Sequence, residues 1–167
     1  MSRGFVKEDD LEHAGTDLPE RPISSHVNYV TPVGLHQLEN AADALDKERL
    51  ALLIQKDNET AKQRLAVIDR DLRYLSARLE QAILVEPANQ DSSTVLFGAK
   101  VKVEDEDGAL LQFHLVGEDE ADITQQKVSY VSPIANALIG RKVGDCVVWQ
   151  RPAGAMTLDI IEISYSI

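Results

Sequence analysis

The chain has 167 residues, with 28 acidic and 17 basic side chains and a formal net charge of −11. A surface with this excess of negative charge is repelled by nucleic-acid phosphates, so autonomous DNA binding is not expected, and a basic patch on a partner protein is a better match. The single cysteine, Cys146, excludes an intrachain disulfide. The sequence has no apolar run of membrane-spanning length and no signal-peptide pattern. Together these features predict a cytoplasmic protein without membrane contact.

Residues 1–28 are polar and are interrupted by glycine and proline, which predicts a flexible N-terminal arm. The arm contains few large apolar side chains, too few to order it by burial. Those side chains could dock on the body of the protein or on a partner; they are Phe5, Val6, Leu11 and Leu18.

Residues 29–85 predict an antiparallel coiled-coil hairpin. Thr31-Pro32 is a helix start, a hydroxyl cap followed by proline at the first helical position. Apolar residues then recur at spacings of three and four, most regularly from Ala61 to Ala82, and such a stripe needs a facing helix. A polar run from Lys56 to Glu59 marks the turn. Two helices of about 24 residues at ~1.5 Å rise per residue would be roughly 36 Å long.

The end of this hairpin combines charge and apolar surface. Asp57 and Glu59 lie in the predicted turn, where carboxylates are ordinarily solvated residues. The run Leu50–Ile54 is apolar all round the helix, which is wider than a coiled-coil stripe requires. These side chains either pack within the end of the hairpin or form an exposed patch. We expect a monomer, with self-association through Leu50–Ile54 as the alternative.

Residues 86–94 have the composition of a linker, and residues 95–167 read as a small α+β domain built on an antiparallel sheet. The expected strands are 95–103, 109–116, 128–131, 145–150 and 157–164, with a hairpin turn at 105–108. Ser132-Pro133 predicts the start of a short helix that ends before Gly140. Cys146, beside Val147 and Val148, is expected to be buried as a small hydrophobe.

Six separate blocks in this C-terminal part carry a resemblance to a known family. They are Val95–Ala99, Val116–Asp122, Val128–Ala135, Ala137–Gly140, Val143–Asp145 and Pro152–Gly154. In order and spacing they look like the C-terminal domain of the Gre transcript-cleavage factors. Upstream, Tyr29–Leu35 and Arg64–Leu75 resemble the two helices of the Gre coiled coil, the second in its GreB form.

The resemblance implies a helical hairpin followed by an FKBP-like domain, and an accessory factor with no catalytic residues, cofactor or metal of its own. In this family the C-terminal domain docks at the rim of the secondary channel of bacterial RNA polymerase, and the coiled coil enters the channel. Acidic residues at its tip, here Asp57 and Glu59, help the polymerase hold a second Mg²⁺ for cleavage of backtracked RNA.

By the same resemblance, the residues expected at the polymerase rim are Glu120, Ser132, Pro133, Ile134 and Ala135. Arg64 and Arg70 are the basic residues expected near RNA, which would be met only inside the polymerase complex. A solvated, ion-paired helix face is the ordinary alternative for these two arginines.

The hairpin departs from the family in length. Between Gly34 and Leu65 the chain is about 14 residues shorter than GreB-like relatives, which at ~1.5 Å per residue would leave the tip roughly 10 Å short of its usual reach. One hypothesis is therefore that the protein modulates elongation and stimulates transcript cleavage. Another is that it regulates the polymerase from the secondary channel without stimulating cleavage. Shortened relatives include the regulator of nucleoside diphosphate kinase, so an interaction protein with a different target enzyme is the third.

No constellation for independent chemistry accompanies these motifs. The four histidines, at positions 13, 26, 36 and 114, have no metal-ligand spacing and no cysteine partners, so no zinc site is expected. Neither a nucleophile motif nor a phosphate-binding glycine loop is present in the sequence.

Overall fold

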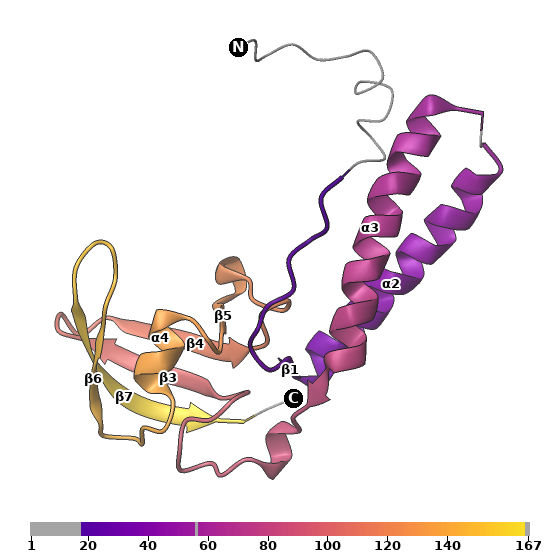
Figure 1. Cartoon of the computed structure of the whole chain (residues 1–167). Helices are drawn as coiled ribbons and strands as arrows, with labels where there is room; N and C mark the ends of the chain where they lie inside the picture. Colours follow the sequence, from indigo (N-terminus) through magenta and orange to yellow (C-terminus); the bar gives the residue numbers. More distant parts are fainter. Residues whose placement is uncertain (1–17, 56, 166–167) are drawn as a thin grey trace, which may run out of the picture. The chain divides into compact units, whose positions relative to one another are not determined.

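The computed structural model describes residues 18–55 and 57–165 (Figure 1). Contacts group the chain into two units. Of the described residues, one unit contains 18–25 and 38–80, and the other contains 26–37 and 81–165. The first turn of the hairpin and the residues just after it therefore belong with the C-terminal part. No helix in the described ranges is long and apolar enough to cross a membrane.

The predicted hairpin is confirmed as helix α2 (Pro32–Leu53, 22 residues) and helix α3 (Glu59–Gln81, 23 residues), side by side in Figure 1. Each helix starts at a capping side chain. Thr31 Oγ1 accepts a hydrogen bond of 3.0 Å from the Gly34 N–H, and Asn58 Oδ1 accepts one of 2.9 Å from the Thr60 N–H. Capping satisfies backbone donors that have no partner inside the helix, which fixes where each helix begins.

Packing between the two helices follows the predicted apolar stripe. Ala61, Ile68 and Leu75 of α3 and Leu38 of α2 are buried. Two ion pairs join the helices beside this stripe. Arg64 contacts Glu48 through both carboxylate oxygens, at 2.6 and 2.8 Å, and Arg49 contacts Asp69 at 2.7 Å.

The C-terminal part is a five-stranded sheet of order β5-β4-β3-β7-β6, which confirms the α+β class. The strands are β3 (Lys100–Asp105), β4 (Leu110–Val116), β5 (Lys127–Ser129), β6 (Cys146–Trp149) and β7 (Met156–Ser164). The β3–β4 hairpin turn falls where it was predicted. The β4–β5 pairing is parallel, so the expected antiparallel sheet is in fact mixed.

One face of the sheet is covered by the short helix α4 (Pro133–Leu138), which confirms the predicted start at Ser132-Pro133. The Ser132 hydroxyl accepts a hydrogen bond of 3.3 Å from the Ala135 N–H. The core beneath the helix consists of fully buried aliphatic side chains from the sheet and from α4, among them Val101, Val103, Leu115, Ala135, Leu138 and Leu158.

Three expectations about local structure are wrong. The strand expected from residue 95 begins only at Lys100, because Gly98 has a positive φ of 91° that breaks the extended run. The helix expected to reach Leu84 ends at Gln81. Cys146 was expected to be buried, but it is exposed and its neighbour Val147 is buried. Buried and exposed side chains therefore alternate along β6 in the opposite phase to the one expected.

The early end of α3 has a structural cause. Residues Ile83–Leu84 form a short strand, β2, that pairs in parallel with β1 (Tyr29–Val30) just before α2. The Ile83 N–H donates to the Asn28 carbonyl and the Val85 N–H to the Val30 carbonyl, both at 2.9 Å. The residues that enter the hairpin are thereby hydrogen-bonded to the residues that leave it.

Candidate functional site

The hairpin turn places its acidic residues at the surface. Asp57 and Glu59 are both exposed, and Glu59 is the first residue of α3. Glu59 pairs with Lys62 one turn later at 3.3 Å, and both side chains are largely solvated. Asn58, between the two acids, is occupied by capping α3, where its side chain bonds the Thr60 and Ala61 N–H groups. The turn therefore presents two exposed carboxylates.

Beside the acidic turn, the last part of α2 and the next residue, Ile54, expose apolar side chains. Leu50 is 65% exposed, Leu53 41% and Ile54 86%. Of the two readings left open by the sequence, the exposed patch is correct and packing within the hairpin is wrong for these three residues. We call Leu50, Leu53 and Ile54 the apolar end of the hairpin.

The two arginines expected near RNA both have protein partners. Arg64 forms the two-oxygen contact with Glu48, and this neighbouring guanidinium lowers the pKa of the Glu48 carboxyl. Arg70 lies 3.1 Å from the carboxylate of its neighbour Asp71. Both arrangements match the ion-paired helix face that was the ordinary alternative. A role near RNA stays a prediction for these residues.

The part of the predicted arm that the structure describes contacts α3. Glu20 accepts from both Nε and Nη2 of Arg73, the shortest distance being 2.6 Å, and this contact lowers the pKa of Glu20. Arg21 lies 3.4 Å from Asp71 and stacks 3.8 Å above the centre of the Tyr74 ring. Leu18 contributes to a shallow hollow whose other walls come from α3. The apolar residues Phe5, Val6 and Leu11 lie outside the described residues.

Glu120 was expected at the polymerase rim, but its side chain is only 2% exposed. Its Oε1 accepts a 2.5 Å hydrogen bond from the Thr31 hydroxyl, and its Oε2 lies 3.4 Å from Nζ of Lys127. A partner protein cannot reach this carboxylate without unfolding the loop. Glu120 is thus a positioning residue that ties the start of α2 to the sheet, a role that the acidic run in the sequence did not reveal.

The other residues expected at the rim differ in how far their side chains are exposed. Pro133 is exposed and Ser132 is half-buried as the cap of α4. Ile134 is 3% exposed and Ala135 is fully buried in the core. Only the first two can offer side-chain surface to a partner, while Ile134 and Ala135 hold α4 in place beneath them.

A second link between the start of the hairpin and the sheet unit is aromatic. The rings of Tyr29, Phe97 and Tyr130 contact one another with centres 5.4 to 5.7 Å apart. Tyr130 also donates a 2.5 Å hydrogen bond from its hydroxyl to the Val27 carbonyl. The three residues are separated by up to 101 positions in the chain, so no local sequence pattern predicts this contact.

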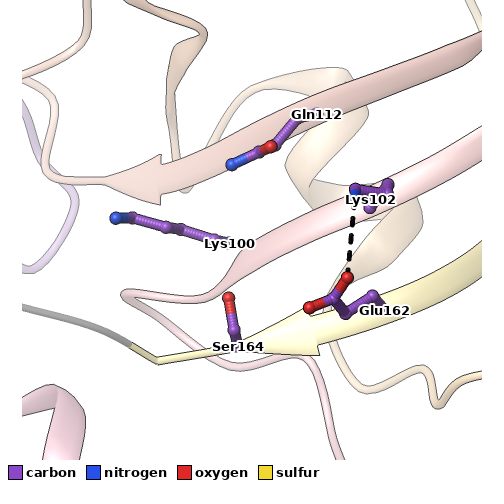
Figure 2. Close-up of a pocket in the computed structure, with 5 residues that line it drawn as sticks. All are labelled: Lys100, Lys102, Gln112, Glu162 and Ser164. Atoms are coloured by element: carbon purple, nitrogen blue, oxygen red, sulfur yellow. Dashed lines mark ion pairs between the residues drawn. The ribbon is translucent and has the colours of Figure 1, made fainter.

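The face of the sheet away from α4 carries an open polar hollow, shown in Figure 2. Its five side chains come from three neighbouring strands: Lys100 and Lys102 from β3, Gln112 from β4, and Glu162 and Ser164 from β7. Lys102 pairs with Glu162 at 3.5 Å. The hollow therefore offers charged and hydrogen-bonding groups to a ligand.

Within the described ranges, no group of three or more histidine, cysteine, aspartate or glutamate side chains could hold a metal ion. His114 is partly buried in the sheet, and desolvation lowers the pKa of its imidazole. The candidate site is therefore a set of surfaces for contact with other molecules: the hairpin turn with its apolar end, and the exposed start of α4.

Comparisons with known proteins agree with this picture. Residues 90–165 match the family model "Transcription elongation factor, GreA/GreB, C-term". The chain is 38% identical over 152 residues to transcription elongation factor GreB of Yersinia pestis, a match that covers 83% of this chain and 89% of the relative. It is 35% identical over 151 residues to transcription elongation factor GreA of Thermodesulfovibrio yellowstonii, covering 81% and 96%.

Among solved structures, the chain is similar to a GreA/GreB elongation factor from Nitrosomonas europaea, with 21% identity, a TM-score of 0.42, and coverage of 83% of this chain and 99% of that one. Because this TM-score is low, the assignment rests on the sequences. Identity above one third extends over nearly the whole length of the GreA and GreB relatives, hairpin and sheet together. The chain belongs to the GreA/GreB family of transcription elongation factors.

Proposed function

We propose that this protein is an accessory factor of bacterial RNA polymerase that modulates elongation from the secondary channel. The observation that carries the proposal is the sequence match, which includes both parts that such a factor needs. One is the sheet unit matched over residues 90–165, and the other is a helical hairpin whose turn is exposed.

The surface that meets the polymerase would include the start of α4. Pro133 and Ser132 present side chains there, whereas Glu120, Ile134 and Ala135 act from beneath by fixing the helix and the loop. A Pro133→Asp variant would place a charge on this surface without removing a core side chain. Binding to purified polymerase core enzyme, measured by fluorescence anisotropy, should weaken for Pro133→Asp and stay unchanged for Glu104→Lys on the sheet.

Two modes of action remain, and features of the turn favour the non-cleaving one. Asn58 is committed to the cap of α3, and Glu59 is within ion-pair distance of Lys62. The apolar end beside them would be exposed inside a polar channel, which is a poor environment for Leu50 and Ile54. Contacts to a metal ion need oxygen ligands at ~2.1 Å, so a hairpin that ends a few ångströms short supplies none.

Transcript cleavage separates the two modes. Backtracked elongation complexes are incubated with Mg²⁺ and saturating protein, and release of the RNA 3′ fragment is followed on gels. The non-cleaving mode predicts no stimulation above polymerase alone, together with competition against a cleaving Gre factor. Stimulated cleavage that is lost in Asp57→Ala/Glu59→Ala, and retained in the charge-matched control Glu104→Ala/Asp107→Ala, would establish the cleaving mode instead.

The third reading, an interaction protein for a different enzyme, is tested by the same purified components. If the full-length protein fails to bind polymerase core enzyme at any concentration used, and tagged protein retains another enzyme from cell extract, the polymerase assignment is overturned.

A further inference from the structure

The polar hollow on the sheet face away from α4, which we call the open face, depends on a bulge in β7. Ile160 of this strand is buried, and regular alternation of side chains would turn Glu162 and Ser164 toward the core as well. The β3–β7 register instead shifts by one residue at Ile161. Ile163 then packs against the core, and Glu162 and Ser164 lie on the open face. Such bulges re-aim side chains and often accompany functional sites.

Strand pairing brings several hydrogen-bond donors to the same place. Lys100 of β3 has Ser164 as its partner on β7, and Lys102 has Gln112 as its partner on β4. Residues paired in this way have Cβ atoms only about 5 Å apart. Figure 2 shows the side chain of Lys100 between those of Gln112 and Ser164. Two ammonium groups, an amide NH₂ and a hydroxyl thus surround one hollow, and all of them can donate.

The hollow is positively charged although the chain as a whole has a formal charge of −11. Its two lysines and one glutamate, Glu162, give it a formal charge of +1, and Glu162 holds Lys102 only at 3.5 Å. In the adjoining row of the sheet His114 lies opposite both Lys100 and Lys127. Desolvation lowers the pKa of the His114 imidazole, and these two ammonium groups lower it further. The local field therefore favours an anion.

The size of the hollow limits the anion. Its volume is about 90 Å³. A water molecule in the liquid takes about 30 Å³, so the hollow has room for about three waters or one small tetrahedral ion. A phosphate monoester brings three strong acceptor oxygens and a charge of about −1.5 to −2 at pH 7, whereas a carboxylate brings two oxygens and one charge. A long nucleic acid would be repelled by the acidic remainder of the protein.

We propose that the hollow binds one phosphate group, either inorganic phosphate or the terminal phosphate of a small phosphomonoester such as a nucleotide. Lys100 and Lys102 supply the positive charge, and Gln112 and Ser164 donate hydrogen bonds to the phosphate oxygens. Glu162 opposes binding, because it repels the anion and competes for Lys102. This inference goes beyond the action on polymerase and does not depend on it.

The test is a titration of the full chain, labelled with ¹⁵N, with sodium phosphate at constant ionic strength. We expect saturable NMR shifts of the Gln112 side-chain amide and of the backbone N–H groups of Lys100 and Lys102. Lys100→Gln should weaken binding about tenfold, because it removes a charge-assisted hydrogen bond. Glu162→Gln should strengthen binding about threefold by removing a nearby negative charge. Lys142→Gln changes an exposed lysine outside the hollow and should leave the affinity unchanged.

Two further ligands separate the sources of the phosphate group. AMP carries a terminal monoester, and a dinucleoside monophosphate carries only a diester. Affinity for AMP at least equal to that for phosphate assigns the site to a phosphomonoester, and tighter binding of phosphate assigns it to the free ion. Equal affinity for the diester and AMP would overturn the proposal in favour of a nucleic-acid backbone.

Two other results would also contradict a phosphate site in the hollow. One is a set of shifts that stays linear in phosphate concentration throughout the titration. The other is an equal loss of affinity in Lys100→Gln and Lys142→Gln, which would mean that only the net charge of the protein matters. Unchanged signals from the buried core residues Leu115 and Leu158 verify that each variant is folded.

Discussion

The Thr31 hydroxyl donates a 2.5 Å hydrogen bond to Oε1 of Glu120, a residue 89 positions later in the chain. The same carboxylate meets Lys127 at 3.4 Å through its other oxygen. Thr31 caps α2 with the hydroxyl that bonds Glu120, so one side chain both starts the hairpin and joins it to the loop after β4. The carboxylate of Glu120, a residue expected at the polymerase rim, thus bonds within the chain, and a contact with the polymerase stays a prediction for this residue.

Removing the Glu120 carboxylate should destabilise the protein substantially. Glu120→Ala leaves the Lys127 ammonium and the Thr31 hydroxyl without their acceptor, and a broken buried pair of this kind costs about 2–4 kcal/mol. The free energy of unfolding from urea titrations measures the loss. Asp107→Ala, an exposed acid in the β3–β4 turn, is the control and should change it by less than about 0.5 kcal/mol. Equal effects of the two substitutions would contradict the internal role of Glu120.

Two glycines near this contact should respond differently to an added methyl group. In Gly117→Ala the new Cβ would overlap the backbone carbonyl oxygen of Tyr29, a residue of the paired strand β1. In Gly34→Ala the new Cβ would lie 2.7 Å from Oε1 of Glu120, the end of a side chain. Gly34→Ala also gains about 1 kcal/mol of helix propensity.

We therefore expect a loss of about 1–3 kcal/mol for Gly117→Ala and a smaller change for Gly34→Ala, because a side chain can shift where backbone cannot. Thermal unfolding followed by circular dichroism compares the two. A larger loss for Gly34→Ala would mean that Glu120, rather than the backbone at Tyr29, is the more rigid of the two neighbours.

At the hairpin turn, Asn58→Ala should cost about 1 kcal/mol, the usual effect of losing a helix N-cap. Asn58 Oδ1 accepts bonds from the N–H groups of Thr60 and Ala61, and alanine has no acceptor to replace it. Asn58→Asp keeps an acceptor at the same position and should preserve stability. Hydrogen exchange at the first turn of α3 reports the effect locally. Unaltered exchange in Asn58→Ala would show that other contacts hold this turn.

The Arg64–Glu48 pair should make stability depend on pH in the acid range. The arginine holds the folded pKa of Glu48 below its ordinary value of 4.5. The stabilisation is therefore fully present above pH 4.5 and is lost as the pH falls through the lowered value. Arg64→Gln should lower the melting temperature at pH 7 and have less effect near pH 3.

Lys47→Gln removes the same charge from an exposed position on α2 and serves as the control for the acid-range prediction. The change in melting temperature caused by Lys47→Gln should not become smaller between pH 7 and pH 3, whereas the change caused by Arg64→Gln should. An Arg64→Gln effect that is constant from pH 7 to pH 3 would show that packing of the arginine side chain, and not its charge, supplies the stability.

Local signals predicted the elements well. Hydroxyl caps followed by proline marked the starts of α2 and α4, and the change of apolar spacing separated helices from strands. These cues depend on a few neighbouring residues, because helix capping and turn formation are local events. The family blocks added the order of the sheet unit and the function that goes with it.

Pairings between distant residues were harder to predict. Neither the parallel β4–β5 pairing nor the β1–β2 pairing has a turn that would announce it, since both join segments across a crossover. Glu120 lies in an acidic run that looks solvated, and only its contact with Thr31 shows otherwise. Cys146 was predicted on the wrong face of the sheet because β6 is a short run of apolar residues. Such a run has no alternation of polar and apolar residues from which the buried face could be predicted.

The short parallel pairing of Tyr29–Val30 with Ile83–Leu84 constrains how the length of this hairpin can be changed. The pairing joins the strand before α2 to the strand after α3. An insertion in one helix alone would therefore shift the register of the residues that face each other across the two helices. Growth or shrinkage must then come as equal insertions or deletions on both sides of the turn, in whole heptads. In this chain the pairing thus fixes the base of the hairpin independently of the number of turns beyond it.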